Sequence, residues 1–298
     1  MDFYELLKGM FKTGIIINYD EDFTGECPVG SSKVGGNPDL PRDFQWYYHK
    51  AKSHEEYTDL PLSFLAQINC ADVCEYDKEK VLPPKGMLYF FYELETMAWG
   101  AWDDKGSARV YYYAGDISGL KRTEFPPDLA DEYKLPEMPM SFSTRVELPD
   151  FVEFLELNTN ISYEDIGYYT MYYGSHDEAM AKILAETGFE KTEEGRVNKL
   201  LGYADTIQNG MLMNCETASR GVDIYGESVG FSEKIPDKEL KQYRENCVKW
   251  RLLFQLDTII TKKYSLYWGD VGRIYYYINS DDLAELNFEN CWLILQCS

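Results

Sequence analysis

Two stretches of this 298-residue chain repeat a pair of polar side chains suited to holding a polar ligand. In each, a glutamine is followed two positions later by an asparagine or an aspartate, and the alternation of a strand turns both side chains to one face. A tryptophan and a further aspartate follow the second pair. An indole can stack on a sugar or another ring, and paired carboxylates can serve as acid and base in glycoside hydrolysis. The candidate ligand-binding residues are Gln67, Asn69, Gln255, Asp257, Trp268 and Asp270.

A structural alternative stays open for the same residues. Amphipathic strands often turn their polar face to water, and a tryptophan often closes a core. The two matched polar pairs favour the ligand hypothesis, because they could line one groove between two similar halves of the chain.

The sequence lacks the residue patterns that other kinds of catalytic or metal site require. The three histidines, His49, His54 and His176, have no metal-ligand spacing, and Cys70 and Cys74 form an isolated C-x3-C pair without the further ligands of a zinc site. The chain has no G-x-S-x-G nucleophile turn, P-loop or G-x-G-x-x-G motif. We therefore expect no catalytic residue, no cofactor and no metal.

The chain repeats a longer pattern around these pairs. Residues 65–69 match 253–257, and residues 86–91 match 272–277, with glutamine-to-glycine spacings of 19 and 17. A shorter echo, Lys33-Val34-Gly35-Gly36, precedes the first copy, and residues 199–202 precede the second. Repetition in the same order indicates an internal duplication.

Periodicity predicts the elements that carry the repeats. Strict alternation in residues 64–69 places Phe64 with Ala66 and Ile68, and in the second copy it places Leu252 with Phe254 and Leu256. Residues 87–93 and 273–279 are apolar on both faces, which predicts central strands covered on both sides. Further strands are expected at 109–114, 141–148 and 292–297. Helices are expected at 2–12, ended by Gly14, within 150–190, where Ser162 and Ser175 each begin one, and at 236–249.

These elements predict an α+β, β-rich fold, internally duplicated, with two similar antiparallel or mixed sheet halves joined by a helical insert. The pseudo-repeats span about 31–150 and 195–298, and the insert about 150–190. No low-complexity linker separates the halves, so we expect a single compact domain over residues 1–298.

The charge balance restricts the partners. A net charge of −22, from 51 acids and 29 bases, argues against nucleic acid and against an anionic membrane surface, and it favours cationic partners. Residues 124–165 carry eleven acids against Lys134 and Arg145, interspersed with aromatic residues, and could form an acidic face with aromatic anchors. The acids are Glu124, Asp128, Asp131, Glu132, Glu137, Glu147, Asp150, Glu153, Glu156, Glu164 and Asp165.

The N-terminal stretch has acids at positions 2 and 5 and no signal-peptide pattern, and no apolar run reaches the ~20 residues of a membrane helix. Seven scattered cysteines fit reduced thiols better than a disulfide framework. We expect a cytoplasmic protein.

Several segments together resemble the YwqG-like proteins, a bacterial family of unknown function. They include KVGGNPDLP at 33–41, PLSFLAQIN at 61–69, LPPKGMLYFFYE at 82–93, NKLLGYADTIQ at 198–208, LLFQLDT at 252–258 and GDVGRIYYYI at 269–278. The resemblance implies a cytoplasmic, mixed α/β protein rich in β structure, and it supplies no catalytic residue, cofactor or substrate. The second corner, Gly202-Tyr203-Ala204, lacks the proline of the family pattern, so that loop is expected to differ in shape.

Two functional hypotheses follow from these observations. The first is a non-enzymatic, immunity-like protein whose acidic face binds a basic protein. The alternative is a protein or enzyme that binds a small polar ligand or sugar in the groove between the two repeats.

Overall fold

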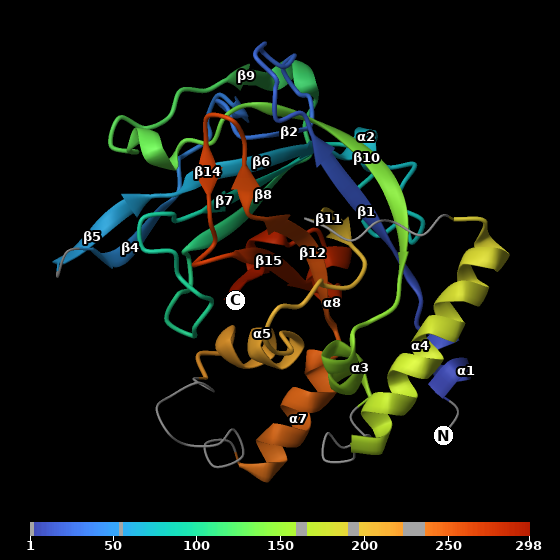
Figure 1. Ribbon diagram of the computed structural model, residues 1–298. Coiled ribbons are helices and arrows are strands. Elements are labelled where there is room, and N and C mark those ends of the chain that lie inside the picture. The colour runs from blue at the N-terminus through green and yellow to red at the C-terminus, as the bar shows by residue number, and fades with distance from the viewer. Residues whose placement is uncertain (1–2, 54–55, 159–165, 190–196, 223–235) are drawn as a thin grey trace.

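The computed structural model describes residues 3–53, 56–158, 166–189, 197–222 and 236–298 (Figure 1). Its strands are β1 (Lys12–Tyr19), β2 (Lys33–Val34), β3 (Asp39–Pro41), β4 (Tyr48–Ser53), β5 (Glu56–Pro61), β6 (Ser63–Asn69), β7 (Met87–Tyr92), β8 (Ala108–Tyr113), β9 (Leu120–Arg122), β10 (Met138–Glu147), β11 (Asn198–Leu201), β12 (Trp250–Asp257), β13 (Ile259–Ile260), β14 (Ser265–Leu266), β15 (Gly272–Asn279) and β16 (Trp292–Cys297). Its helices are α1 (Phe3–Lys8), α2 (Cys70–Val73), α3 (Phe151–Leu157), α4 (Ile166–Thr187), α5 (Leu212–Ala218), α7 (Asp237–Cys247) and α8 (Ser280–Ala284), with 3-10 turns η1 (Ile117–Gly119), η2 (Asp131–Tyr133) and η3 (Phe288–Asn290).

A ten-stranded sheet organises the fold, in the order β16-β15-β12-β11-β1-β10-β2-β6-β7-β8. Each neighbouring pair is antiparallel. The two ends of this order, β8 and β16, are not hydrogen-bonded to each other in the described sheet. Strands β1 and β10 lie at its centre, with residues 33–113 on one side and residues 198–297 on the other. The fold is therefore α+β and sheet-rich, and the two halves expected from the sequence share one sheet.

The sheet curls so that strands of the two halves face each other across one core. Phe90 on β7 lies 4.3 Å from Phe254 on β12 and 5.3 Å from Tyr276 on β15, measured between ring centroids. The hydroxyl of Tyr276 donates to the carbonyl of Phe91 over 2.9 Å. All six residues of β7 are buried, as are the middle residues of β15, which confirms the expectation of strands covered on both faces.

A β-bulge in the same place in β6 and β12 changes which residues share a face. The register shifts between Phe64 and Ala66 in β6, and between Leu252 and Phe254 in β12. Leu65 and Leu253 consequently point into the central core, whereas Phe64 and Leu252 pack on the outer face. The strict alternation predicted for these strands is wrong at this position, because a bulge inserts one extra residue and inverts the pattern before it.

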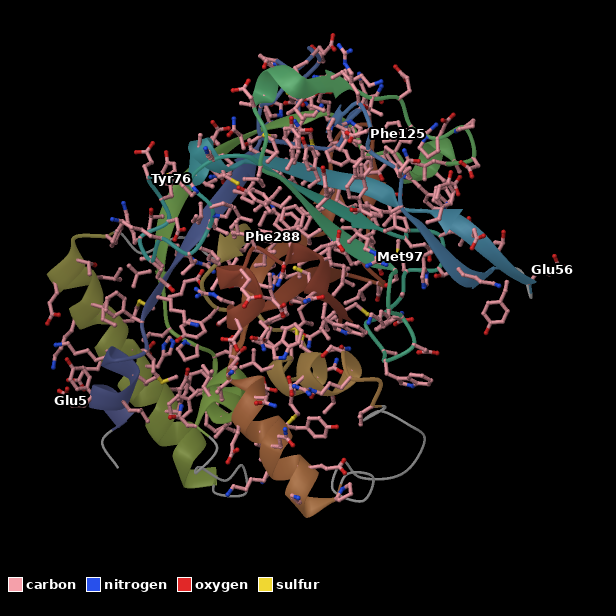
Figure 2. All side chains as sticks on the ribbon, turned by 180° about the vertical axis from the view of Figure 1, so that it is seen from behind. Glu5, Glu56, Tyr76, Met97, Phe125 and Phe288 are labelled. Carbon is pink, nitrogen blue, oxygen red and sulfur yellow. The ribbon has the colours of Figure 1, made fainter. Side chains whose placement is uncertain are left out.

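Three smaller apolar clusters cover the outside of the curled sheet. Helices α5 and α7 cover the outer face of β12, β15 and β16. Helices α1, α3 and α4 pack together beside the end of β10. The segment 38–47 and β9 cover the outer face of β6 and β7. The β4–β5 hairpin extends away from this body, with Glu56 near its tip (Figure 2).

Most predicted elements are present, with three corrections. The first helix ends at Lys8, and Gly14 lies within β1 instead of ending a helix. Ser175 lies inside α4, which begins at Ile166, so it caps no helix. The other proposed helix start, at Ser162, lies outside the described residues. No helix in the described part of the chain is long and apolar enough to cross a membrane.

Candidate functional site

The predicted glutamines lie in two buried ion clusters on the outer face of the sheet. The first cluster consists of Lys33, Asp39, Gln67, Arg122 and Glu137. The second consists of Arg145, Glu147, Lys199, Asp205 and Gln255. Each contains two cations and two carboxylates, so each is electrically neutral.

Gln67 organises the first cluster. Its Oε1 accepts a hydrogen bond from the amide of Asp39 over 2.9 Å, and its Nε2 donates to the Asp39 carboxylate and to the carbonyl of Ser31, both over 2.8 Å. The Tyr89 hydroxyl donates to the carbonyl of Asp39. Arg122 Nε lies 2.6 Å from the same carboxylate. All polar atoms of the Gln67 amide are therefore used within the protein.

Gln255 organises the second cluster through the same set of bonds. Its Oε1 accepts from the amide of Asp205 over 2.9 Å, and its Nε2 donates to the Asp205 carboxylate over 3.0 Å and to the carbonyl of Val197 over 2.8 Å. The Tyr275 hydroxyl donates to the carbonyl of Asp205 over 2.8 Å. Gln67 and Gln255 are both fully buried, so a ligand in solvent contacts neither of them.

Each cluster encloses a buried lysine on a short strand. Lys33 is opposite Gln67 in the sheet, and Lys199 is opposite Gln255. Lys33 Nζ lies 3.1 Å from the Glu137 carboxylate, and burial lowers the pKa of its ammonium group. Lys199 Nζ lies 2.6 Å from Asp205 and 2.9 Å from Glu147.

The electrostatics of Asp205 show how strongly these groups interact. Burial alone would raise the pKa of Asp205, but the charges of Lys199 and Arg145 lower it to about 2. Removing one partner from such a buried set leaves an uncompensated charge, which is strongly destabilising. The two clusters thus act to hold strands in register.

The other four predicted ligand-binding residues have separate roles in the structure. Asn69 caps α2 and donates to the carbonyl of Gly30 over 3.1 Å. Asp257 is buried and paired with Arg273 at 2.6 Å. Trp268 is fully buried in the central core against Tyr92, and Asp270 is exposed on the turn before β15. The expected groove lined by these side chains is not formed, because Asn69 and Asp257 bond to the segments beside them and Trp268 fills the core.

The acids of residues 124–165 do not form one face. Glu137 and Glu147 belong to the ion clusters, Asp150 caps α3, Glu153 is buried, and Glu156 accepts the amides of Leu212 and Met213. Glu164 and Asp165 lie outside the described residues. The exposed ones are Glu124, Asp128, Asp131 and Glu132. Phe151 and Phe154, expected as anchors, are buried in the helical cluster.

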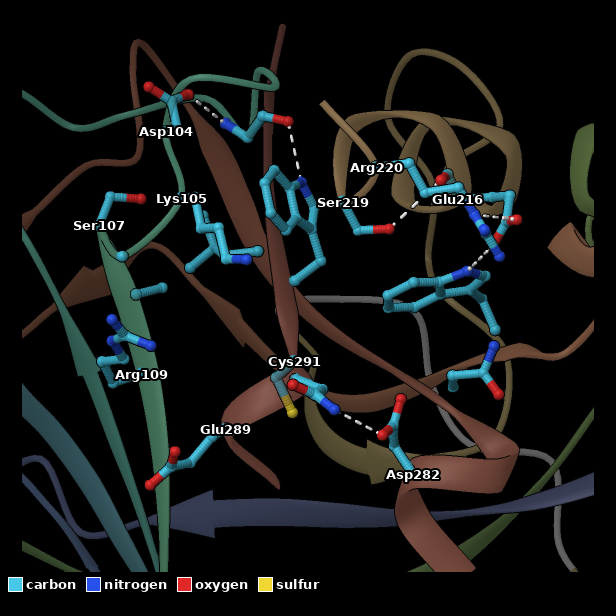
Figure 3. Close-up of a pocket in the computed structure, with 18 residues that line it drawn as sticks. Asp104, Lys105, Ser107, Arg109, Glu216, Ser219, Arg220, Asp282, Glu289 and Cys291 are labelled. Carbon is cyan, nitrogen blue, oxygen red and sulfur yellow. Dashed lines mark hydrogen bonds and ion pairs between the residues drawn. The ribbon is translucent and has the colours of Figure 1, made fainter. Parts of the chain in front are cut away.

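A pocket of about 230 Å³ lies where the two edge strands begin, and we call it the seam pocket (Figure 3). Its wall on the β8 side comes from residues 104–109, and its other walls come from α5, α8, η3 and the start of β16. The indole of Trp292 donates to the carbonyl of Gly100 over 3.0 Å, and the amide of Leu295 donates to the carbonyl of Trp99 over 3.2 Å. These bonds hold the 94–107 segment against β16 and shape the pocket.

Charged side chains from both halves of the chain line the seam pocket. Arg220 pairs with Glu216 at 2.6 Å, and Asp282 accepts from Asn290 over 2.6 Å. Lys105, Arg109 and Glu289 make no hydrogen bond or ion pair with any residue that the structure describes, although Arg109 lies 6.0 Å from the ring centre of Tyr47. The pocket therefore offers two cationic groups and one carboxylate to a ligand.

One short sequence motif marks both ion clusters. Both copies read K-x2-G-x2-D, from Lys33 to Asp39 and from Lys199 to Asp205. The two aspartates are the partners of the two glutamines. The seam pocket has no comparable signal, because its residues come from five separate segments.

Fold and site together define an α+β protein whose curled antiparallel sheet holds paired ion clusters and a polar pocket at its seam. The chain belongs to a family described as a domain of unknown function (DUF1963), whose model matches residues 32–297. A search among curated proteins found no match to this chain.

Proposed function

We propose that this protein binds a small zwitterionic ligand in the seam pocket and works as a binding protein. The observation that carries the proposal is a set of charged groups in one pocket that have no partner among the described residues: Lys105 and Arg109 on the β8 side, and Glu289 on η3. The two cations suit a carboxylate, and Glu289 suits an ammonium group. A volume of about 230 Å³ is below the ~300 Å³ at which sites for drug-sized ligands begin, so the ligand is no larger than an amino acid or a short peptide.

Like the groove expected from the sequence, the seam pocket is lined by segments from both halves of the chain. Its residues replace the six candidates chosen from the sequence. None of the six lines this pocket.

A thermal-shift screen with amino acids, dipeptides, sugars and nucleotides tests the proposal. A ligand at ~100 times its Kd should stabilise the protein by about 2.7 kcal/mol. For each hit, the N-acetylated form and the carboxamide form are compared with the zwitterion. The Arg109→Met variant should remove the preference for a free carboxylate, and Glu289→Gln the preference for a free amine.

Lys241→Met is the matched control, because Lys241 is an exposed lysine on α7 outside the pocket. A screen without hits, or a hit whose shift is the same in Arg109→Met, Glu289→Gln and the parent protein, contradicts the proposal.

A basic protein partner is a second candidate, favoured by the net charge. The ion clusters are neutral, so the charge of −22 lies on the rest of the chain. The exposed acids from Glu124 to Glu132 lie beside the projecting hairpin, where the Tyr48 hydroxyl is 3.2 Å from Asp128. Affinity capture from a bacterial lysate at low and high salt tests this candidate. A partner whose capture is lost at high salt, and also in the Glu124→Gln/Asp128→Asn variant, supports this candidate. Capture that is the same at low and high salt counts against it.

We further propose that residues 31–150 and 195–298 are copies of one unit, and that the protein is YwqG-like and cytoplasmic. The duplication is supported by the matching pairs Lys33–Gln67 and Lys199–Gln255, and by bulges at Leu65 and Leu253. The six segments quoted above support the family name.

A further inference from the structure

A second pocket, of about 540 Å³, opens beside α8, and we call it the α8 pocket. One wall is the segment 80–85, which leads into β7, and the opposite wall is α8 with Leu286. Leu82 and Leu283 belong to the central core, so the pocket reaches the apolar interior of the curled sheet. Its lining comes from both halves of the chain and is mainly apolar, with Val81, Pro83 and Pro84 completing one side.

The charges on this pocket are opposite in sign to those of the protein as a whole. Lys80, Lys85 and Arg251 line it, and among the described residues no aspartate or glutamate does, although the chain carries a net charge of −22. The ammonium groups of Lys80 and Lys85 form no hydrogen bond or ion pair within the described structure. At physiological ionic strength the Debye length is ~8 Å, which weakens the effect of more distant acids on an anion in this pocket. Glu79 is close, but it is paired with Arg251.

Arg251 adds a donor that has no acceptor among the residues the structure describes. Its Nη2 lies 2.7 Å from Glu79 Oε2, but its Nε is buried and has no partner in the part of the chain that the structure describes. A buried N–H without an acceptor is unfavourable, and an anion in the pocket could supply the missing acceptor.

Two strained residues line the same pocket. Lys80 and Leu286 have left-handed backbones, with φ of 55° and 60°, and only two other non-glycine residues of the described chain share this feature. At Leu286 this backbone conformation ends α8: the amide of Asn287 donates to the carbonyl of Asp282 over 2.8 Å, a pattern common at helix C-termini. Leu286 is 43% exposed. The two turns place an apolar side chain and a lysine at the rim of one cavity.

From this arrangement we propose that the α8 pocket binds a small carboxylic acid with an apolar tail. Lys80, Lys85 and Arg251 receive the carboxylate, and the tail lies against Leu82, Leu283 and Leu286. The charge complementarity selects an anion, and the apolar walls exclude inorganic anions as good ligands. This site is separate from the seam pocket, and neither proposal depends on the other.

Octanoate is the probe, and octanamide is its uncharged counterpart of the same length. Calorimetric titration of the full chain should show octanoate binding at least about tenfold more tightly than octanamide, as expected when a charge-assisted contact is lost. The Lys80→Met/Lys85→Met variant should lose that preference by a similar factor. Lys78→Met removes one charge from the same loop outside the pocket and should change octanoate affinity less than about twofold.

Leu286→Gly separates binding from folding. Glycine relieves the left-handed backbone, so the thermal midpoint of this variant should not fall, while octanoate affinity should fall several-fold with the lost apolar wall. Three results would overturn the proposal: no binding of octanoate, equal affinity for octanoate and octanamide, or octanoate binding that survives unchanged in Lys80→Met/Lys85→Met.

Discussion

Glu147 reaches Lys199 across the position of Gly14, which has no side chain to obstruct it. A Cβ atom on residue 14 would lie 2.8 Å from Glu147 Oε1. Glu147 comes from β10 and crosses β1 to lie 2.9 Å from Lys199 Nζ on β11, and it also accepts the amide of Tyr203 over 2.7 Å. In the first cluster Glu137 needs no such path, because it directly precedes β10, which pairs with the strand of Lys33.

The Gly14→Ala variant should be less stable by about 1–3 kcal/mol. The added methyl group displaces a carboxylate that Lys199, Arg145 and the Tyr203 amide hold, so these contacts are weakened together. Urea unfolding measures the loss. Gly174→Ala is the control: Gly174 lies in α4 with no atom of the described residues within 4 Å of its added Cβ, and alanine there should stabilise by about 0.5–1 kcal/mol. A neutral Gly14→Ala would show that Glu147 is not constrained as described.

Replacing Gln67 or Gln255 should lower the free energy of unfolding by a similar amount. Gln67→Met and Gln255→Met each leave a buried aspartate amide and a backbone carbonyl without partners, for which we expect a loss of about 2–4 kcal/mol in the free energy of unfolding. Urea denaturation of the two variants provides the comparison. Losses that differ by several kcal/mol would argue against equivalent roles for the two residues, and so against the proposed duplication.

The second ion cluster should contribute to acid sensitivity. The pKa of Asp205 is about 2 in the folded protein, below the ordinary aspartate value of 3.8, so its stabilising contribution is complete above pH ~4 and disappears as the pH falls towards 2. The contribution amounts to about 2 kcal/mol. Asp205→Asn should therefore be less stable than the parent protein at pH 7, and this difference should shrink between pH 4 and pH 2.5. Urea midpoints over this range measure it, and a constant difference would refute the assignment.

Glu153 should have the opposite pH dependence. Burial raises its pKa to about 8 in the folded protein, against the ordinary glutamate value of 4.5, so the native state binds this proton more tightly than the unfolded chain. Stability from this group is complete below pH ~4.5 and is lost as the pH rises towards 8. Glu153→Gln should flatten the decline in unfolding free energy between pH 5 and pH 8. The exposed Glu124→Gln serves as control, and an unchanged slope in Glu153→Gln would show that another group titrates.

Sequence patterns were sufficient for the elements that have a simple periodicity. Apolar residues on both faces predicted β7 and β15, and the last strand was expected at its observed limits, Trp292–Cys297. Polar residues two positions apart were also predicted to share a face. Gln67 and Asn69 do donate hydrogen bonds to one segment, at the carbonyls of Ser31 and Gly30. These predictions succeed because period and residue type act locally along the chain.

The candidate site depended on contacts that no local pattern encodes. Gln67 and Gln255 were identified as special, but their partners, Asp39 and Asp205, made them internal and not ligand-binding. For Trp268 the sequence left two roles open, a stacking platform for a ligand or a residue that closes the core, and the curl of the sheet places it against Tyr92 in the core. The residues that line the seam and α8 pockets were not predicted, since each pocket needs segments from both halves.

By itself the sequence determined the strands, most helices, the recurring residues and the acidic charge of this protein, because each depends on residue type and short-range spacing. Only the tertiary structure decided which polar groups are buried and which face a ligand. That choice depends on the bulges at Leu65 and Leu253, on β1 and β10 at the centre of the sheet, and on the curl that brings Phe90 to Tyr276. Burial is a property of the whole packed chain, so a residue's neighbours in sequence do not specify it.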